Sequence, residues 1–158
     1  MRAEHIDGVV AVARLSFPDH FESRACFENR LDLYPAGCFV LSDLDGAVNG
    51  YLFAYPWKGE SAPALNTVIE TLPTDADRIY LHDLALHPDT RGGGFTRPIV
   101  EQLATQARAD GWPMIALVAV NDAAAFWARL GFEAVDSPAI RAKLESYGPD
   151  ARYMIREL

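Results

Sequence analysis

The chain has few lysines. Only Lys58 and Lys143 occur among its 158 residues, and the formal net charge at pH 7 is -8. A nucleic-acid-binding protein needs a positive patch that neutralises phosphates, so this charge balance argues against a nucleic-acid partner. A negative field also repels anions at long range and favours the approach of a cationic amine. An anionic ligand must therefore be held locally, by backbone amides or by arginines such as Arg91 and Arg97.

Cysteine and long apolar runs are also scarce. Cys26 and Cys38 have neither the spacing of a zinc site nor that of a redox motif, so we expect two buried thiols. No apolar run reaches the roughly 20 residues of a membrane-spanning helix, and no signal peptide is visible. These absences predict a cytoplasmic protein without a membrane partner.

The remaining composition is that of a globular protein, 50% hydrophobic and 23% charged, and the length predicts a single domain over residues 1–158. Hairpins and one βαβ unit predict an α/β (α+β) fold with a mixed, mostly antiparallel sheet flanked by helices. Helices are expected at residues 6–17, 22–33, 96–110 and 121–131, and strands at 38–41, 48–55, 78–86, 114–120, 133–135 and 151–157.

Two parts of the chain do not follow this simple plan. The segment 56–77 is longer than a hairpin loop should be, and long loops are often functional. The chain also enters its first helix almost at once, so residues 1–4 leave little room for a leading strand. The first edge of the sheet is then uncovered, which favours a homodimer.

The most informative feature is a glycine turn between the strand at 78–86 and the next helix. Gly92, Gly93 and Gly94 are consecutive, so the backbone can adopt positive φ and approach a ligand closely. Thr96 is the expected N-cap of the following helix, and Pro98 lies in its first turn. Backbone amides and the helix dipole together predict a site for a phosphate group.

The spacing decides which phosphate ligand is expected. The turn is neither G-x-x-x-x-G-K-[ST] nor G-x-G-x-x-G, which disfavours a nucleoside triphosphatase and a Rossmann cofactor. The pattern Arg91-x-x-Gly94-x-Thr96 resembles the coenzyme A signature R/Q-x-x-G-x-G/A of the GNAT acyltransferase superfamily. Thr96 departs from that signature, and either widens the turn or supplies the helix cap.

A second element downstream strengthens this resemblance. The run from Asn121 to Phe132 is similar to the superfamily's N-x-x-A-x-x-[FY]-x-x-x-G-F element. Asn121 is expected to cap a short helix, and Gly131 to end it in the left-handed conformation. Both motifs occur in the expected order, so the chain is identified as a member of the GNAT superfamily.

The resemblance implies acetyl-CoA as co-substrate, with no metal, and a primary amine of a small molecule as acceptor. The parallel strands then splay apart, the pantetheine arm pairs with the first of them, and a main-chain N–H near Leu86 stabilises the oxyanion. The implied cofactor-binding residues are Leu84, Ala85, Leu86, Arg91, Gly92, Gly93, Gly94, Phe95, Thr96, Asn121, Phe126 and Trp127.

His82 is the candidate general base, because an imidazole is the side chain whose ordinary pKa lies near neutrality and it can accept a proton from an amine. The stretch Leu-His-x-Leu-Ala-[LV]-His around it also resembles the arylalkylamine branch, where such a histidine lines the acceptor tunnel. The alternative is a core histidine bonded to its neighbours. By strand alternation Asp83 points to the other face, with a structural role. His82 and His87 lack a third ligand for a metal.

The general acid that would protonate the leaving thiolate has several candidates. Family members commonly carry a tyrosine where this chain has Trp127, and an indole N–H is not a usable acid. Tyr80 or Tyr153 could protonate the thiolate, water could do so, or the thiolate could leave unprotonated. A further alternative is a non-catalytic domain that binds or senses acyl-CoA.

Acceptor recognition is expected from two aromatic segments. Asp19 and Glu22 are carboxylates available for an ammonium group. The expected apolar wall consists of Phe17, Phe21, Tyr55 and Trp57.

Overall fold

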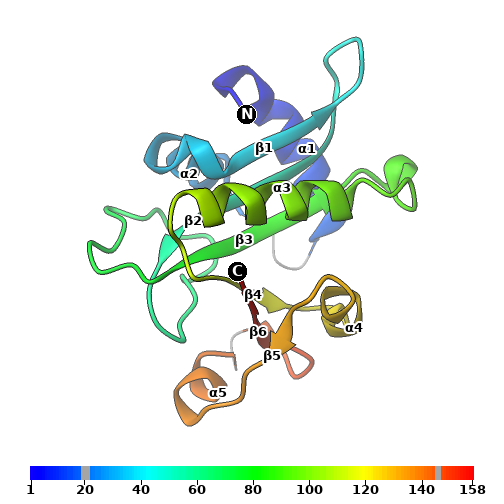
Figure 1. The fold of residues 1–158 in the computed structure, drawn as a ribbon. Helices are drawn as coiled ribbons and strands as arrows, with labels where there is room; N and C mark the ends of the chain where they lie inside the picture. Colours follow the sequence, from blue (N-terminus) through cyan, green and yellow to red (C-terminus); the bar gives the residue numbers. More distant parts are fainter. Residues whose placement is uncertain (19–21, 145–146) are drawn as a thin grey trace. The chain divides into compact units, whose positions relative to one another are not determined.

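A computed structural model describes residues 1–18, 22–144 and 147–158 (Figure 1). Its helices are α1 (Ile6–Ser16), α2 (Arg24–Leu33), α3 (Thr96–Ala109), α4 (Ala124–Ala128) and α5 (Pro138–Leu144). Its strands are β1 (Cys38–Ser42), β2 (Val48–Trp57), β3 (Arg78–Leu86), β4 (Met114–Ala119), β5 (Glu133–Ala134) and β6 (Arg152–Glu157). Short 3-10 turns lie at Ala3–His5, Pro35–Gly37 and Pro88–Thr90.

The strands form one mixed sheet in the order β1-β2-β3-β4-β6-β5. The pairs β1–β2, β4–β6 and β5–β6 are antiparallel, and β3–β4 is parallel. The predicted fold class and the βαβ unit are therefore confirmed. The register between β3 and β4 consists of Ile79 opposite Ile115 and Tyr80 opposite Ala116.

The chain divides into two compact units, each described by itself. The first comprises Met1–Tyr55, Pro63–Leu72 and Leu81–Phe95, and the second comprises Pro56–Ala62, Pro73–Tyr80 and Thr96–Leu158. The expectation of a single domain stays a prediction.

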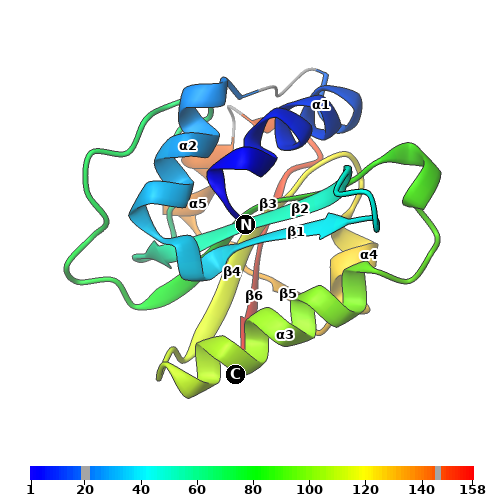
Figure 2. The same ribbon diagram turned by 90° about the horizontal axis from the view of Figure 1, so that it is seen from above.

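The core of the first unit lies between its two helices and the β1–β2 hairpin. Helices α1 and α2 cover the same face of these strands (Figure 2). The Phe27 ring of α2 stacks on Phe53 of β2, with ring centroids 5.5 Å apart. Gly8 lets α1 approach the sheet, because a Cβ there would lie 2.6 Å from the Cβ of Val48. The buried face of α1 consists of Ile6, Val9, Val12 and Ala13.

The core of the second unit is built on α3, β4 and β6. Val100, Leu103, Ala104 and Ala107 form the buried face of α3, as their helical spacing predicts. Gly111 has φ 82° and follows the end of this helix, where a glycine in the left-handed conformation is a common stop.

The structure corrects several local expectations. Thr96 is the first residue of α3 rather than its cap. Asn121 does not cap α4, because that helix begins at Ala124 and Asn121 has φ 53°. Helix α5 was not predicted. Within the described residues no strand precedes α1, since a 3-10 turn occupies Ala3–His5; a homodimer through the sheet edge stays a prediction.

Part of the long segment 56–77 is tied to α2 in the first unit. Asn29 exchanges two hydrogen bonds with the backbone of Ile69, each 2.9 Å long. The Arg30 guanidinium donates to the carbonyl of Thr67 at 2.7 Å and lies 3.4 Å from Oε1 of Glu22. Only 1% of the Arg30 side chain is exposed. A buried cation without these partners would be costly, so α2 and the segment 63–72 hold each other in place.

Arg30 should therefore matter far more to stability than another arginine of the same helix. We expect Arg30→Met to lower the free energy of unfolding by about 3 to 5 kcal/mol, because it leaves the buried Glu22 carboxylate without its cation. Arg24 is the matched control: it is half-exposed and pairs with Asp7 and Glu28. Arg24→Met should cost less than about 1 kcal/mol. Urea unfolding measures both variants, and equal losses of unfolding free energy would contradict this account.

Candidate active site

A buried histidine–carboxylate pair lies in the first unit. Strand β3 carries His82, and the residue just before α2 is Glu22. Nε2 of His82 lies 2.7 Å from Oε2 of Glu22, and only 4% and 5% of the two side chains are exposed. The sequence predicted a functional role for His82, whereas the role predicted for Glu22 was to bind an ammonium group. That role does not fit a carboxylate buried against protein donors.

The second oxygen of Glu22 is also bonded. Its Oε1 accepts a hydrogen bond from the backbone N–H of Asn66 at 2.8 Å and faces the Arg30 guanidinium. Burial raises the pKa of the Glu22 carboxyl, but the hydrogen bond with His82 and the charges of His82 and Arg30 lower it by more. The net pKa lies below its usual range, so Glu22 is a carboxylate at neutral pH.

One sequence signal could have pointed to this network. The buried face of α2 consists of Cys26, Phe27 and Arg30. An arginine inside an apolar helical stripe needs a buried partner, because an isolated buried charge is too costly. The sequence cannot say which of its carboxylates is that partner.

Asp83 follows His82 in β3 and accepts a hydrogen bond from the hydroxyl of Tyr51 at 2.5 Å. Burial raises the pKa of the Asp83 carboxyl to about 6, although the Tyr51 hydroxyl and the charge of His82 oppose this. Its structural role agrees with the sequence, but its partner lies on the neighbouring strand rather than in a loop.

The expected opposite orientation of His82 and Asp83 is wrong. The ring of His82 lies 5.6 Å from that of Tyr55, while Asp83 binds Tyr51. Tyr51 and Tyr55 are four residues apart on β2 and therefore share a face. Two consecutive residues of β3 thus reach one face of β2, so regular alternation is interrupted there.

The residues of the expected apolar acceptor wall lie in different parts of the structure. Phe17 is half-buried and packs against the core of the first unit, and Tyr55 is buried beside His82. Trp57 belongs to the second unit, where its Nε1 donates to the hydroxyl of Ser61 at 3.1 Å. Phe21 and Asp19 lie outside the described residues. The acceptor site therefore stays a prediction.

The glycine turn has the backbone that its sequence predicts. Gly92 and Gly94 have φ 78° and 79°, and a Cβ on either would meet no atom within 4 Å. The amides of Arg91 and Gly93 donate to the carbonyls of Pro88 and Thr90. Within the described residues, the amides of Gly92, Gly94 and Phe95 have no such acceptor. The turn thus presents three amides in open surroundings.

Arg91 braces this turn rather than extending from it. Its Nε donates to the carbonyl of Leu86 at 3.2 Å, and its guanidinium donates to the hydroxyl of Ser16 at 3.2 Å. Arg97, in the second unit, donates to the carbonyl of Arg129 at 2.9 Å. Both arginines are exposed, so their charges remain at the surface.

The other predicted cofactor residues are placed as follows. Leu84, Ala85 and Leu86 form the end of β3 in the first unit. In the second unit Asn121 is exposed, Phe126 is half-buried and Trp127 is buried between the rings of Phe126 and Phe132.

The two candidate tyrosine acids are both buried in the second unit. Tyr80 is 1% exposed. The Tyr153 hydroxyl accepts from Arg78 at 3.1 Å and donates to the carbonyl of Gly59 at 3.2 Å. Burial raises the pKa of Tyr153, although Arg78 opposes this. A tyrosine engaged in this way is poorly suited to deliver a proton.

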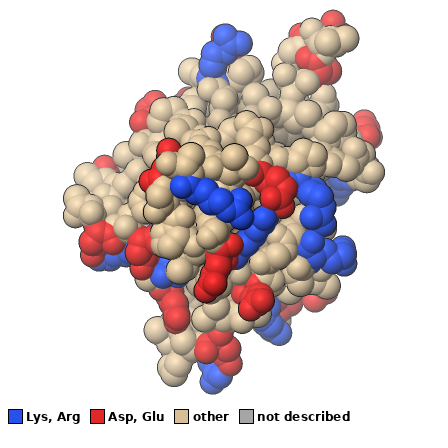
Figure 3. Space-filling view, viewed as in Figure 1, with Lys and Arg blue, Asp and Glu red and all other residues tan. Residues whose placement is uncertain are grey.

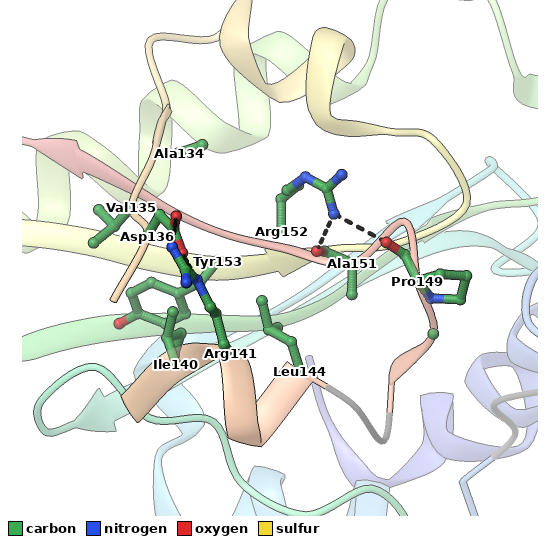
Figure 4. A pocket seen from close by; sticks show the side chains of 11 residues that line it. Ala134, Val135, Asp136, Ile140, Arg141, Leu144, Pro149, Ala151, Arg152 and Tyr153 are labelled. Atoms are coloured by element: carbon green, nitrogen blue, oxygen red, sulfur yellow. Dashed lines mark hydrogen bonds and ion pairs between the residues drawn. The ribbon is translucent and has the colours of Figure 1, made fainter. Parts of the chain in front are cut away.

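A separate pocket of about 760 Å³ lies in the second unit, between β5, α5 and β6 (Figure 4). Arg141 and Asp136 pair on its wall, and Arg152 donates to the carbonyls of Pro149 and Ala151. None of the predicted cofactor or acceptor residues lines it. Tyr153 is the one candidate acid that does.

Other features of the described residues bear on the expected partners. No group of three His, Cys, Asp or Glu side chains there could hold a metal ion. No described helix has the length and apolarity that crossing a membrane requires. On the face drawn in Figure 3, Lys and Arg lie among Asp and Glu rather than in one patch. Both cysteines are buried free thiols, as expected.

Residues 6–132 match the model of the acetyltransferase (GNAT) family. The match covers most of the chain, so this protein belongs to that family, as the two motifs indicate. A search of curated proteins finds no match.

Several solved structures share the fold. N-acetylglutamate synthase from Neisseria gonorrhoeae, complexed with coenzyme A and N-acetyl-glutamate, is 18% identical with a TM-score of 0.74; the alignment covers 99% of this chain and 34% of that one. This chain therefore spans about one third of that synthase. The Escherichia coli GNAT family N-acetyltransferase YhbS, in complex with CoA, is 20% identical (TM-score 0.64, coverage 99% and 78%). The GphF GNAT-like decarboxylase, in complex with isobutyryl-CoA, is 17% identical (TM-score 0.78, coverage 99% and 96%).

At these identities the likeness shows the fold alone. It does not select a branch of the family, so the resemblance to the arylalkylamine branch stays a prediction.

The raised pKa of Asp83 predicts a pH-dependent stability. Folded Asp83 gains its proton near pH 6, whereas an unfolded aspartate does so near 3.9, so stability falls as pH rises through this window. Asp83→Asn keeps an acceptor for Tyr51 but cannot ionise. Relative to the wild type it should gain roughly 2 to 3 kcal/mol between pH 4 and pH 7. Urea unfolding at several pH values measures this difference, and parallel curves for the two proteins would contradict it.

Proposed function

We propose that this protein is an N-acetyltransferase that moves an acetyl group from acetyl-CoA to a primary amine of a small molecule. The observation that carries this proposal is the open glycine turn. Gly92 and Gly94 hold left-handed conformations, and three amides of the turn have no internal acceptor among the described residues. Backbone N–H groups arranged in this way bind phosphate, and membership of the GNAT family makes the diphosphate of acyl-CoA the natural ligand.

The proposed reaction is direct attack in a ternary complex. The amine nitrogen attacks the thioester carbon, and a main-chain N–H near Leu86 stabilises the developing oxyanion. The C–S bond then breaks and the thiolate takes its electron pair. His82 removes the proton from the amine, because an ordinary amine with pKa about 10.4 is mostly protonated at neutral pH.

The proton for the thiolate has no dedicated donor in this proposal. Trp127 stands where the family commonly has tyrosine, and the Tyr153 hydroxyl is engaged. A thiol has an ordinary pKa near 8.5, so the thiolate can leave unprotonated and take a proton from water.

A non-catalytic acyl-CoA-binding domain is the second candidate, and the buried Trp127 favours it. Fold alone cannot decide, because GNAT-like structures include a decarboxylase. Thiol release from acetyl-CoA across a panel of small primary amines separates the two. Turnover on one of them supports the transferase, and CoA binding without turnover on any supports the sensor.

The base assignment predicts a selective loss of chemistry. His82→Ala should lower kcat by about 10² to 10⁴-fold, the usual contribution of a general base, while the affinity for CoA stays within twofold. The control is His87→Ala, because His87 is partly exposed and its Nδ1 contacts Asp89: it accepts from the backbone N–H of that residue at 3.3 Å and lies 3.6 Å from its carboxylate. Equal rates for wild type and His82→Ala would refute the assignment.

The turn predicts a selective loss of binding. Gly94→Val places a β-branched residue in a left-handed conformation beside the expected diphosphate, so we expect CoA affinity to fall at least about tenfold. Gly46 is a matched control, since it has φ 88° and open surroundings in the β1–β2 turn. Gly46→Val should carry similar strain without loss of affinity. Calorimetric titration with CoA measures the affinity of each variant. Equal affinities of Gly94→Val and Gly46→Val would contradict a CoA site at this turn.

A further inference from the structure

The buried partner of His82 was not part of the predicted site. Glu22 lies 60 positions from His82 in the sequence, yet its carboxylate is 2.7 Å from Nε2 of the ring. Asn66 and Arg30 donate to its other oxygen. Each of these residues belongs to the first unit. A carboxylate held from three sides has little freedom to turn, so the ring that it contacts is held as well.

The charge of Glu22 determines which ring nitrogen carries the proton. An ionised carboxylate only accepts hydrogen bonds, and the lowered pKa of Glu22 keeps it ionised near neutral pH. At 2.7 Å the shared hydrogen must therefore belong to Nε2 of His82. In the neutral ring Nδ1 then bears the lone pair.

We propose that Glu22 is a positioning residue that holds His82 in the Nε2–H tautomer and leaves Nδ1 as the proton acceptor. In this scheme the amine N–H bond breaks, the proton moves to Nδ1, and the ring becomes an imidazolium. The Glu22 carboxylate stabilises that positive charge. The proton then passes to water, and the departing thiolate takes one from water in turn. The kinetic part of this inference rests on the proposed function, whereas the tautomer does not.

Other charged and titratable groups around the ring act differently. Arg30 pairs with the Glu22 oxygen that does not contact the ring. Asp83 is the next residue in β3, but its carboxylate is bonded to the Tyr51 hydroxyl. From β2, Tyr55 presents its ring to that of His82. Glu22 makes the hydrogen bond with Nε2 that fixes the position of that nitrogen's proton.

The tautomer is tested on the whole chain without substrate. We expect a long-range ¹H–¹⁵N spectrum of histidine-labelled protein at pH 7.5 to show His82 protonated at Nε2 and not at Nδ1. In Glu22→Gln the amide can accept or donate, so both tautomers should appear. A wild-type ring protonated at Nδ1 would overturn the proposal.

Kinetics provide the second readout. In Glu22→Gln, kcat for the best amine should fall about 10²-fold, and the acid limb of the kcat/KM profile should move to lower pH, because the protonated ring has lost its counter-charge. Glu22→Asp, which keeps the charge, should recover part of kcat. A Glu22→Gln enzyme with wild-type kcat and pH profile would also overturn the proposal.

Controls separate this test from that of the proposed function. Glu28→Gln removes a half-exposed carboxylate of α2, paired with Arg24, and should change neither spectrum nor kinetics. If the wild type acetylates no amine, the proposed function fails while the spectrum still decides the tautomer. If Glu22→Gln does not fold, the wild-type spectrum alone decides it.

Discussion

The first unit depends on one buried ion pair, Glu22 with Arg30. Removing two charges from water costs several kcal/mol for each, and their attraction compensates only when further hydrogen bonds complete the site. Here Asn66 and His82 hydrogen-bond to the Glu22 carboxylate, and the carbonyl of Thr67 accepts a hydrogen bond from the Arg30 guanidinium. Three segments distant in the sequence must therefore meet correctly, or each charge is left buried alone. This requirement specifies the arrangement of the segments as much as it stabilises them.

The same pair connects stability with chemistry. The Glu22 carboxylate contacts the backbone of Asn66, the Arg30 guanidinium and the His82 imidazole, so the residue that helps to hold the fold is also the one proposed to orient the candidate base. The break in alternation of β3 adds Asp83 to this side of the strand. Carboxylates, imidazole and phenol are thus gathered in an interior where electrostatic interactions are strong. Such gatherings are typical of functional sites, although structural networks also produce them.

The glycine turn is simpler. The groups proposed to bind the cofactor are backbone amides, so its side chains matter mainly because they are small. Gly92 and Gly94 provide the positive φ values, and Arg91 braces the turn against β3 and α1. The ligand class can be argued from this local geometry because few residues take part. The acceptor is different, because the residues proposed to recognise it are spread over several segments of the chain.

The sequence by itself determined the family, the glycine turn, the buried face of α3 and most strands, because each is encoded by neighbours a few residues apart. It missed α5, took Thr96 for the cap of α3 although it is the first helical residue, and misplaced the start of α4, where Asn121 looked like the cap. Boundaries depend on competition between local signals and packing. Only the tertiary structure decided that Glu22 meets His82 and Arg30, and that Asp83 turns toward Tyr51. No local pattern encodes a contact across 60 residues, because a buried charge specifies that it needs a partner but not which one.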